Sequence, residues 1–574
     1  MIVKPSEMPH AKVITRPVNP QARAALEQAG TSPLLARLFA ARNVLSADEL
    51  GDSLSALLPH GQLKGCAEAA QRLADAVQNH ENILIIADYD ADGATACTVA
   101  LKGLRGMGAA ADFFVPNRFE HGYGLTPELA DIARTRGAQL ILTVDNGISS
   151  REGVARAREL GMDVVVTDHH VAGRYVPDCI IVNPNQQGCA FPSKNLAGVG
   201  VIFYVLTALR AELRGRGHFS GSLREPNLAE LLDLVALGTV ADVVPLDRNN
   251  RILVSQGLKR MRAGKMCCGI KALFEAARRD PRKAQPFDMG FGLGPRLNAA
   301  GRLDDMTVGI ACLLAENDET AQQLAAKLNS LNQARQEIEQ GMLADVLADF
   351  PAALPAEQMT LCAYRADFHQ GVTGIVAGRL KERFYRPTFV FAPAGGGEVR
   401  GSGRSLAGLH LRDVVDTIAK RCPDLISRFG GHAMAAGLSM REDGLAEFER
   451  AFEQVVRETA DESLLAQTYL TDGSLDAADL TLPCARELAQ PVWGQGFPPP
   501  SFADEFGVSR QQRLGGDKQH VKAWLHKDGG EYEAMFWRCE TDLPARVRVV
   551  YRPTVNEWRG NEELQLYAEY WEAA

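Results

Sequence analysis

Four short acidic blocks in the first 245 residues limit the fold of this chain more than any other feature. Three of them come directly after runs of Val, Ile and Leu that are typical of buried strands, at 83–86, 140–144 and 164–167. The fourth follows a helix-like apolar run at 231–240. Helical stretches separate these runs, so we expect a doubly wound parallel sheet whose strands end at one edge. The blocks are Asp88-Tyr89-Asp90-Ala91-Asp92-Gly93, Asp145-Asn146-Gly147, Asp168-His169-His170 and Asp242.

The residue types in these blocks predict a metal site. One acidic turn after a strand is commonly a solvated loop, but carboxylates that follow consecutive parallel strands converge at the same edge. Carboxylate oxygens mixed with imidazole nitrogens suit Mn²⁺ or Mg²⁺, and a pair of such cations is typical of phosphoryl chemistry. We therefore expect two divalent cations, Mn²⁺ or Mg²⁺, at this edge.

The length of 574 residues is too great for one core and indicates several domains. We expect an N-terminal helical segment at 1–75 and a catalytic α/β domain at 76–315. A long periodic helix at 316–350 either connects two domains or is an ordinary core helix. A smaller α/β domain at 351–462 follows, and short alternating runs at 463–574 predict a β-barrel of the OB type, with a small sandwich as the alternative. The fold class is thus α/β and multidomain.

Composition excludes several classes of protein. The net charge of −9 argues against a protein that coats nucleic acid non-specifically, although a narrow basic channel remains compatible with it. The chain shows no apolar run of membrane-spanning length and no signal peptide, and its 11 cysteines form no CxxC pair. We expect a cytoplasmic protein with reduced thiols and no membrane partner.

Several motifs resemble those of the DHH phosphoesterase superfamily, and in particular its single-stranded-DNA-specific exonucleases. The resemblance runs from about Ser32 to Leu566. It implies a 5′-to-3′ exonuclease that hydrolyses single-stranded DNA to 5′-mononucleotides in DNA repair and recombination. The resemblance also implies that the protein acts together with a single-strand-binding protein and a helicase. The motifs are Asp88 to Gly93, Asp168-His169-His170, the block from Gly292 to Arg302, the block from His369 to Ala377, Gly401-Ser402-Gly403-Arg404-Ser405 and Gly430-Gly431-His432.

By this resemblance Asp145 would bridge the two cations. Asp90 and Asp92 are placed to address different cations, and His169 with Asp242 would complete one coordination shell. Asp88 either binds a cation directly or accepts a hydrogen bond from a residue that does. As catalytic residues, His170 would face the scissile phosphate and Asp168 would orient an imidazole.

Phosphate binding is expected from a second set of residues. An arginine fork matches two phosphate oxygens, and Arg296 and Arg302 flank what we expect to be a small-residue turn. We expect 401–405 to be a loop around one phosphate, and Tyr123 to stack on a base or pack as an ordinary aromatic. The DNA- or phosphate-binding candidates are Arg118, Arg296, Arg302, Ser402, Arg404 and His432. In the barrel, the candidates for stacking or phosphate contact are Trp524, Phe536, Trp537, Tyr551, Trp558, Lys522, Arg548 and Arg552, with most of the aromatics expected in the core.

Two other functions remain compatible with the motifs. One is a phosphodiesterase for short oligonucleotides or cyclic dinucleotides, which would need only the two catalytic domains. The other is a DNA-binding scaffold without activity, against which the complete set of acidic residues argues.

Overall fold

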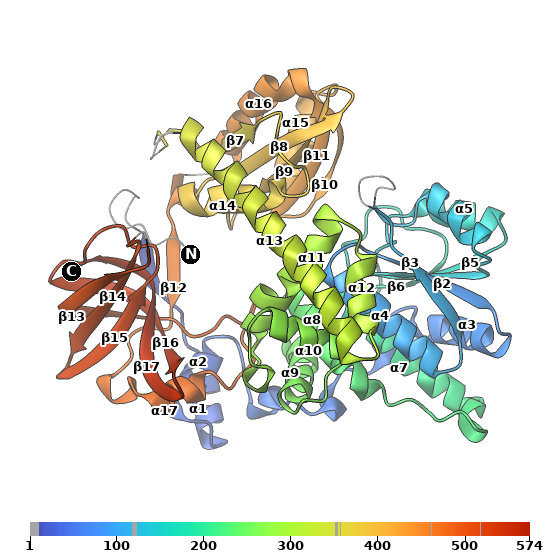
Figure 1. Cartoon of the computed structure of the whole chain (residues 1–574), viewed down its shortest axis with the longest axis horizontal. Helices are drawn as coiled ribbons and strands as arrows, with labels where there is room; N and C mark the ends of the chain where they lie inside the picture. Colours follow the sequence, from blue (N-terminus) through green and yellow to red (C-terminus); the bar gives the residue numbers. More distant parts are fainter. Residues whose placement is uncertain (1–10, 118–122, 351–353, 356, 461, 517) are drawn as a thin grey trace. The chain divides into compact units, whose positions relative to one another are not determined.

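The chain divides into two compact units, shown in the cartoon of Figure 1. This computed structural model describes residues 11–117, 123–350, 354–355, 357–460, 462–516 and 518–574. The first unit comprises Ser46–Ala334 and Val492–Pro499, and the second comprises Met1–Leu45, Arg335–Pro491 and Pro500–Ala574. The domain limits expected from the sequence remain a proposal.

The first unit contains the predicted parallel sheet, with strand order β3-β2-β4-β5-β6. The strands are β2 (Asn82–Ala87), β3 (Ala110–Phe114), β4 (Leu140–Val144), β5 (Asp163–Thr167) and β6 (Ile180–Val182). The register pairs Ala87 with Val144 and Val144 with Thr167, so β2, β4 and β5 end at the same level. The acidic blocks therefore leave the sheet side by side.

Helices cover the sheet as expected for a doubly wound fold (Figure 1). Helices α5 (Pro127–Thr135) and α6 (Arg151–Glu159) pack on the face that carries Leu84, Ile141 and Val166. Helices α3 (Cys66–Gln78), α4 (Ala91–Gly106) and α7 (Gly198–Gly215) contact the strands and one another. The mostly helical remainder comprises α8 (Leu232–Ala241), α9 (Arg248–Arg262), α10 (Cys268–Ala276), α11 (Gly294–Leu303) and α12 (Thr307–Leu314).

The small-residue turn expected between Arg296 and Arg302 is wrong, because this segment belongs to helix α11 (Gly294–Leu303). A π-helical turn, η7 (Asp288–Leu293), runs directly into α11, and Pro295 occupies the first turn of α11. A proline is tolerated there because the first N–H groups of a helix have no intrahelical acceptor. Arg296 and Arg302 therefore lie on one helix and do not flank a turn.

The N-terminal segment is only partly helical. Helices α1 (Pro20–Gln28), α2 (Pro33–Ala40) and α3 are present, and the Ser32 hydroxyl accepts a hydrogen bond from the Leu35 N–H at the start of α2. Three short 3₁₀ turns follow α2: Ala47–Leu50, Leu54–Ala56 and His60–Gln62. Strand β1 (Lys12–Thr15) pairs in parallel with β12 (Thr468–Thr471), and Leu38 of α2 belongs to the core of the C-terminal barrel.

The predicted long helix is confirmed as α13 (Asp318–Asp349), which continues from the first unit into the second. In the second unit it is held by Glu339, whose carboxylate accepts hydrogen bonds from Arg335 at 2.6 Å and from Arg379 at 2.8 Å. Arg379 lies on α14 (Thr373–Phe384), which packs on a mixed sheet of order β10-β11-β9-β8-β7. Its strands are β7 (Leu361–Tyr364), β8 (Thr388–Gly395), β9 (Glu398–Arg404), β10 (Ile426–Gly431) and β11 (Ala435–Arg441), with α15 (Leu411–Arg421) and α16 (Leu445–Thr459) beside them.

The segment 401–405 is not the phosphate loop expected from its glycines. It lies mostly within β9, whose backbone is paired with β8 and β11 on its two sides. The glycines serve packing, because a Cβ at Gly401 would lie 2.4 Å from the Phe391 ring and one at Gly403 would lie 2.5 Å from the Phe389 ring. Glycine therefore lets two phenyl rings lie flat on this strand.

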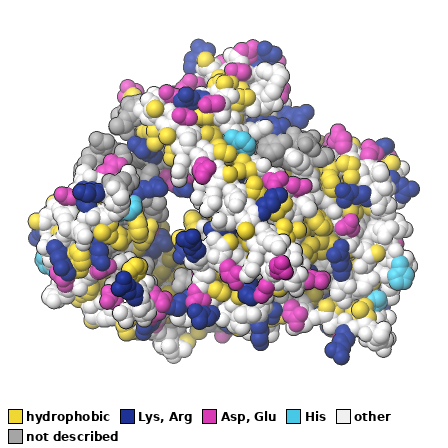
Figure 2. Space-filling view, viewed as in Figure 1, with side chains coloured by type: hydrophobic (Ala, Val, Ile, Leu, Met, Phe, Trp, Pro, Cys, Tyr) yellow, Lys and Arg dark blue, Asp and Glu magenta, His cyan; other side chains and the backbone are white. Residues whose placement is uncertain are grey.

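The C-terminal strands form a closed barrel of order β13-β14-β15-β17-β16 and not a sandwich. They are β13 (Phe502–Leu514), β14 (His520–Lys527), β15 (Gly530–Phe536), β16 (Arg546–Trp558) and β17 (Asn561–Ala573), with α17 (Leu482–Leu488) packed against them. Over the face drawn in Figure 2, Lys and Arg side chains are interspersed with Asp and Glu side chains. In the described part of the chain, no helix combines the length and apolar character needed to cross a membrane.

Candidate metal centre

Three aspartates extend the sheet by one hydrogen bond each. The backbone N–H of Asp88 donates to the carbonyl of Val144. In the same way, the N–H of Asp145 donates to the carbonyl of Thr167, and the N–H of Asp168 donates to the carbonyl of Val182. Each aspartate is thus fixed one residue beyond its strand. Asp145 has a φ of 63°, a left-handed conformation that aspartate tolerates better than most residues. The carboxyl edge predicted from the sequence therefore carries these side chains together.

The N-terminus of helix α7 holds one further carboxylate, that of Asp92, and lies against Asp145. The side chain of Asp92, fully buried in the first turn of α4, accepts hydrogen bonds from the N–H groups of Gly198 at 2.6 Å and Val199 at 3.0 Å. A Cβ at Gly198 would lie 2.5 Å from both Cβ and Oδ1 of Asp145. Gly198 therefore lets α7 approach the sheet edge, a role that the sequence did not single out.

The predicted ligands fall into three groups whose donor atoms lie within 4.8 Å of one another. Asp88, Asp90 and Asp145 form one group, and Asp92, His169 and Asp242 form another. Asp145, His169 and His170 form the third. Asp90 and Asp92 fall in different groups, and Asp145 belongs to two. His169 also belongs to two groups, and a carboxylate present in two groups is compatible with a ligand shared by two cations.

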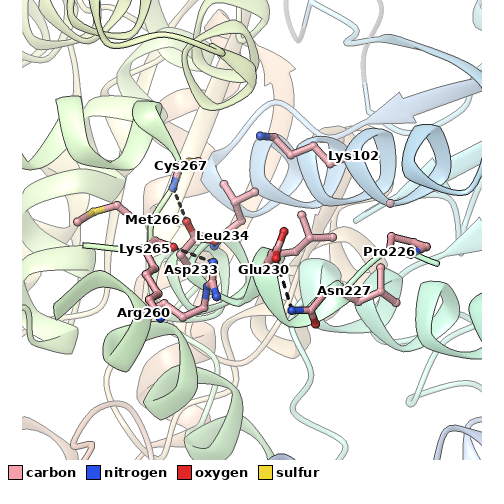
Figure 3. A pocket seen from close by; sticks show the side chains of 13 residues that line it. Lys102, Pro226, Asn227, Glu230, Asp233, Leu234, Arg260, Lys265, Met266 and Cys267 are labelled. Carbon is pink, nitrogen blue, oxygen red and sulfur yellow. Dashed lines mark hydrogen bonds between the residues drawn. The ribbon is translucent and has the colours of Figure 1, made fainter. Parts of the chain in front are cut away.

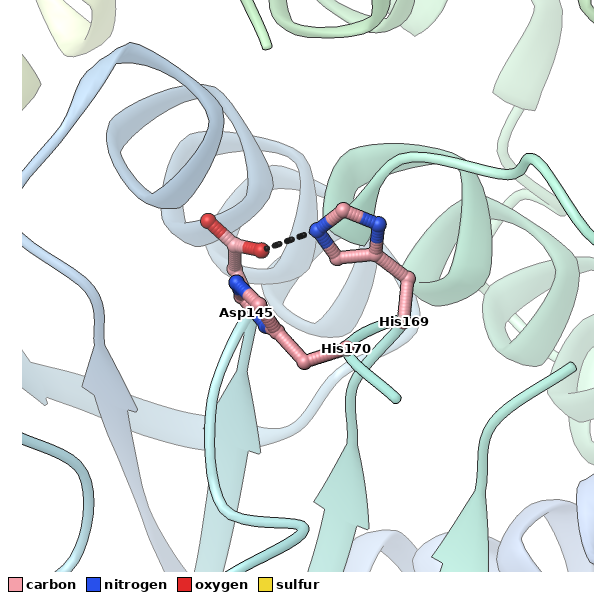
Figure 4. A group of neighbouring side chains, drawn as sticks. All are labelled: Asp145, His169 and His170. Carbon is pink, nitrogen blue, oxygen red and sulfur yellow. Dashed lines mark ion pairs between the residues drawn. The ribbon is translucent and has the colours of Figure 1, made fainter. Parts of the chain in front are cut away.

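His169 points its Nε2 into the centre of the cluster. This atom lies 3.2 Å from Asp145 Oδ1 (Figure 4) and 3.5 Å from Asp242 Oδ2. Both His169 Nε2 and Asp145 Oδ1 are buried, and neither makes a hydrogen bond. Buried polar atoms are almost always paired, so two such atoms facing one another fit a bound cation. The donor set of carboxylates and one neutral imidazole fits Mn²⁺ or Mg²⁺.

Burial and mutual repulsion dominate the electrostatics of the cluster. Burial, with the charge of Asp90, raises the pKa of Asp92 to about 7. Burial and the neighbouring carboxylates also raise the pKa of Asp145 and of Asp242 well above the ordinary value. Burial lowers the pKa of His169 to about 4, so its imidazole is neutral. A neutral imidazole is the form that binds a metal, and a cation relieves the repulsion among the carboxylates.

Asp168 has a different set of partners. Its carboxylate accepts hydrogen bonds from the backbone N–H groups of Ile148, His169 and His170 and lies 2.7 Å from His170 Nδ1. Burial alone would raise its pKa, but the contact with His170 lowers the pKa below the ordinary value. The imidazole beside Asp168 is thus that of His170, which is half-exposed and lies 3.3 Å from the Tyr123 hydroxyl. Although burial opposes it, Asp168 raises the pKa of His170 to about 9.

Helix α11 holds the loop that carries Asp88 and Asp90. The side-chain carbonyl of Asn298 accepts a hydrogen bond from the N–H of Ala91 at 2.8 Å. A Cβ at Gly301 would lie 1.8 Å from the carbonyl oxygen of Tyr89. The sequence motif at 292–302 therefore contacts the first acidic block directly. Asn298 was within that motif, but nothing in the sequence alone separated it from its neighbours.

The arginine candidates of the first unit differ in their surroundings. The guanidinium of Arg296 donates to the carbonyls of Gly292 at 2.6 Å and Ala276 at 3.1 Å and to the side chain of Asn329 at 3.0 Å. These bonds fasten η7 to α11, so Arg296 already has protein partners where a phosphate contact was expected. Arg302 lies in the last turn of α11. Arg118 lies outside the described residues.

The second unit brings Ser402 and Arg404 beside the start of α14. The Thr373 hydroxyl donates to the Ser402 hydroxyl at 3.0 Å, and a Cβ at Gly374 would lie 2.8 Å from the Arg404 guanidinium. Ser402 and Arg404 alternate with Gly401 and Gly403, so they face away from the phenyl rings. Burial lowers the pKa of Arg404. His432 lies in the turn between β10 and β11, where its N–H donates to the carbonyl of Ala435.

Only two of the five aromatic candidates of the barrel lie in its core, fewer than expected. Phe536 and Tyr551 are buried, whereas Trp537 and Trp558 are exposed. The guanidinium of Arg510 lies 3.8 Å from the ring centre of Trp524. The three cationic candidates each have an acidic neighbour: Lys522 with Glu533, Arg548 with Glu572 and Arg552 with Glu569.

A separate cavity of about 380 Å³ lies near the end of α4 and the start of α8, away from the helix ends beside Asp92 and Asp242 (Figure 3). It is lined by Lys102 near the end of α4 and by Asp233 in the first turn of α8. The carboxylate of Asp233 accepts hydrogen bonds from the N–H groups of Leu234 and Cys267. Asp233 is therefore a buried acid with backbone partners, unlike Asp145.

Comparison with known proteins identifies three segments. Residues 82–239 match the DHH family, N-terminal domain, residues 357–458 match the DHHA1 domain and residues 471–570 match the RecJ OB domain. The single-stranded-DNA-specific exonuclease RecJ of Salmonella typhimurium is 50% identical over 549 residues, which cover 93% of this chain and 95% of that protein.

Two solved structures show the same fold over almost the whole chain. RecJ from Thermus thermophilus in complex with Mn²⁺ has a TM-score of 0.82 at 30% identity, covering 98% of this chain and 79% of that one. The complex of the same protein with Mg²⁺ has a TM-score of 0.77 at 29% identity, covering 98% of this chain and 78% of that one.

Proposed function

The chain belongs to the RecJ family, and we propose that it is a single-stranded-DNA-specific exonuclease, a hydrolase of phosphodiester bonds. The observation that carries this proposal is the convergence of Asp145 Oδ1 and His169 Nε2, both buried and without a hydrogen bond, within a cluster of carboxylates. We further propose 5′-to-3′ polarity with release of 5′-mononucleotides, and a role in DNA repair and recombination.

The cluster is proposed to hold two divalent cations, Mn²⁺ or Mg²⁺. Asp88 and Asp90 would bind one, and Asp92, His169 and Asp242 the other, with Asp145 shared. Bound cations of this kind polarise phosphate oxygens and make a water molecule more acidic. The protein fixes the donors beforehand, because Asp92 is held by α7 and the 88–92 segment by Asn298.

His170 is proposed to contact the scissile phosphate. It is half-exposed beside the cluster, and Asp168 keeps its imidazole protonated and oriented. An imidazolium in this position stabilises the negative charge that develops on phosphate oxygens. Asp168 acts through His170 and is a positioning residue in this scheme, because its own oxygens are taken up by backbone N–H groups.

Polarity is proposed to come from recognition of the terminal 5′-phosphate in the second unit. Ser402 and Arg404 present a hydroxyl and a guanidinium on one face of β9, beside Thr373. Because β9 uses its backbone in the sheet, this site would rest on side chains and not on a loop of N–H groups. His432, Arg302 and Arg118 remain proposed phosphate contacts, whereas Arg296 would act by holding η7 to α11.

The barrel is proposed to add a second strand-binding surface and contributes no candidate metal ligand among the described residues. Exposed Trp558 and the Trp524–Arg510 pair are the candidate stacking surfaces. A single-strand-binding protein and a helicase are proposed as partners.

One assay separates this function from its competitors. A long single strand, the matching duplex and a dinucleotide, each labelled at the 5′ end, are incubated with the chain and Mn²⁺ or Mg²⁺. The proposal predicts rapid loss of single nucleotides from the 5′ end of the single strand and little cleavage of the duplex. Preference for the dinucleotide would indicate a short-substrate phosphodiesterase, and no cleavage of any substrate would indicate a scaffold.

A further inference from the structure

Two phenylalanines of the first unit form an exposed apolar surface. Phe287 is 55% exposed and Phe291 is 73% exposed, and their rings stack with centres 4.7 Å apart and planes at 24°. Single exposed apolar residues are common, but two large rings held against each other in solvent are not. We call these residues the Phe287–Phe291 pair.

The fold holds the pair outward. Met289 and Leu293, from the same turn, are fully buried. Gly290 faces Val240, and a Cβ at Gly294 would lie 3.1 Å from Cβ of Ala241, so η7 is fastened to the end of α8. π-Helical turns occur mostly as single turns and frequently at functional sites. The exposed rings are therefore a fixed feature of a well-packed turn.

Basic residues precede the pair in the sequence, and one of them, Arg279, lies beside it. Arg278, Arg279, Arg282 and Lys283 fall within six residues of sequence just before it. The Arg279 guanidinium lies 5.9 Å from the Phe287 ring centre and 3.7 Å from the Asp288 carboxylate. Asp280 and Asp288 are the acids of this segment, so 278–291 is cationic in a chain whose net charge is −9. Aromatic rings beside cations are the combination that binds single strands without reading their sequence.

The pair is also joined to the candidate metal centre by the chain itself. η7 packs against Val240 and Ala241, directly before Asp242, and continues into α11, whose Asn298 holds the 88–92 segment. Both connections lie within the first unit. The Phe287–Phe291 pair therefore lies on the same unit as the metal cluster, where the scissile phosphate of the strand is proposed to bind.

We propose that the Phe287–Phe291 pair is a stacking platform for one or two bases of the single-stranded substrate, with Arg279 contacting an adjacent phosphate. This inference rests on the proposed function, because the occupant is the strand that the enzyme cuts. Stacking accepts any base, so the platform holds the strand in place without selecting its sequence.

The platform is tested with the full chain and with Phe291→Leu, which keeps an apolar side chain without a ring, and Phe291→Trp, which keeps a ring. Phe219→Leu, in the 3₁₀ turn at 218–220, is the matched control. Binding of 20-nucleotide strands is measured with divalent cations chelated, and dinucleotide cleavage is measured with Mn²⁺. We expect Phe291→Leu to bind about tenfold more weakly, with Phe291→Trp and Phe219→Leu unchanged. Dinucleotide cleavage, which reports on folding, stays normal in all variants.

An abasic scan locates the platform on the strand. In the unaltered chain, removing the base at one or two positions weakens binding about tenfold, and in Phe291→Leu the same removal has no further effect. Arg279→Ala lowers the slope of log affinity against log salt by roughly 0.7.

Equal affinity of Phe291→Leu and the unaltered chain would overturn the proposal. So would equal weakening at every abasic position, which would show that no particular base is held. Suppose instead that Phe291→Leu binds DNA normally but loses a concentration-dependent self-association of the unaltered chain. The pair would then be a contact between two copies of the chain. If the unaltered chain cuts no single strand, the proposed function itself fails, a result distinct from a defect confined to Phe291→Leu.

Discussion

Gly198 and Asp145 lie so close that any side chain at position 198 would occupy the space of the carboxylate, since a Cβ there would be 2.5 Å from Asp145 Oδ1. The same glycine donates its N–H to Asp92. One backbone position thus sets the placement of two carboxylates: Asp92, a proposed ligand of one cation, and Asp145, the proposed ligand of both. The packing of α7 on the sheet and the geometry of the centre are therefore coupled.

Gly198→Ala tests this coupling. The added methyl group must push Asp145 or α7 away, so we expect Mn²⁺ affinity to fall about 10- to 100-fold and cleavage to fall with it. Titration calorimetry and single-strand cleavage measure the two effects. Gly200→Ala on the same helix is the control, because its Cβ would meet only the flexible side chain of Leu196, at 3.1 Å. Equal effects of the two substitutions would show that α7 packing, and not the contact with Asp145, is responsible.

Asn298→Ala tests the contact between α11 and the first acidic block. It leaves the buried N–H of Ala91 without its acceptor, so we expect a loss of about 1–3 kcal/mol in the free energy of unfolding. Cleavage should fall about 10- to 100-fold, because the segment carrying Asp88 and Asp90 loses its support. Asn227→Ala, which removes the exposed N-cap of a 3₁₀ turn, should leave cleavage unchanged even where the lost cap lowers the stability. Normal cleavage by Asn298→Ala would mean that α11 does not position the ligands.

Arg404→Ala tests the proposed origin of polarity. If its guanidinium binds the terminal 5′-phosphate, the variant should lose about tenfold or more of kcat/KM on 5′-phosphorylated strands and much less on 5′-hydroxyl strands. Arg441→Ala, at the far end of the neighbouring strand and paired with Asp443, is the control. An equal loss on both kinds of strand would indicate a general contact with the DNA backbone.

Arg42→Ala tests the attachment of the N-terminal segment to the barrel. Arg42 and Asp472 form two hydrogen bonds of 2.9 Å and are almost fully buried. Asp472 keeps its ion pair with Arg16 at 3.3 Å and its hydrogen bond from the Ser501 N–H, so we expect the free energy of unfolding of this unit to fall by about 1–3 kcal/mol in calorimetry. Arg23→Ala removes an exposed pair with Glu27 and should cost at most about 0.5 kcal/mol. If Arg42→Ala lowers the free energy of unfolding as little as Arg23→Ala does, the Arg42–Asp472 pair does not anchor the N-terminal segment.

Much of the first unit could be predicted because its signals are local. Strands β2, β4 and β5 are short apolar runs rich in β-branched residues, and an acidic block directly follows each of them. Strand order and register then place Asp88, Asp145 and Asp168 at one edge, as expected for parallel sheets. The long helix α13 and the barrel strands also have clear periodicity.

The errors arose where distant contacts decide the structure. The pairing of β1 with β12 joins segments far apart in the sequence, and nothing near Lys12 indicates it. Gly401 and Gly403 suggested a loop because their partners, the rings of Phe391 and Phe389, lie on another strand. The hydrogen bonds of Arg296 to the carbonyls of Gly292 and Ala276 could not be foreseen either, because these partners come together only after folding.

The sharing of Asp145 by two cations is the central claim, and electron paramagnetic resonance of bound Mn²⁺ tests it most directly. The unaltered chain should bind two Mn²⁺ and give the spectrum of a spin-coupled pair, because one carboxylate joins the ions. Asp145→Asn should lose the coupled spectrum and nearly all cleavage, whereas the exposed Asp163→Asn should keep both. A coupled pair that persists in Asp145→Asn, or two uncoupled ions in the unaltered chain, would contradict the account.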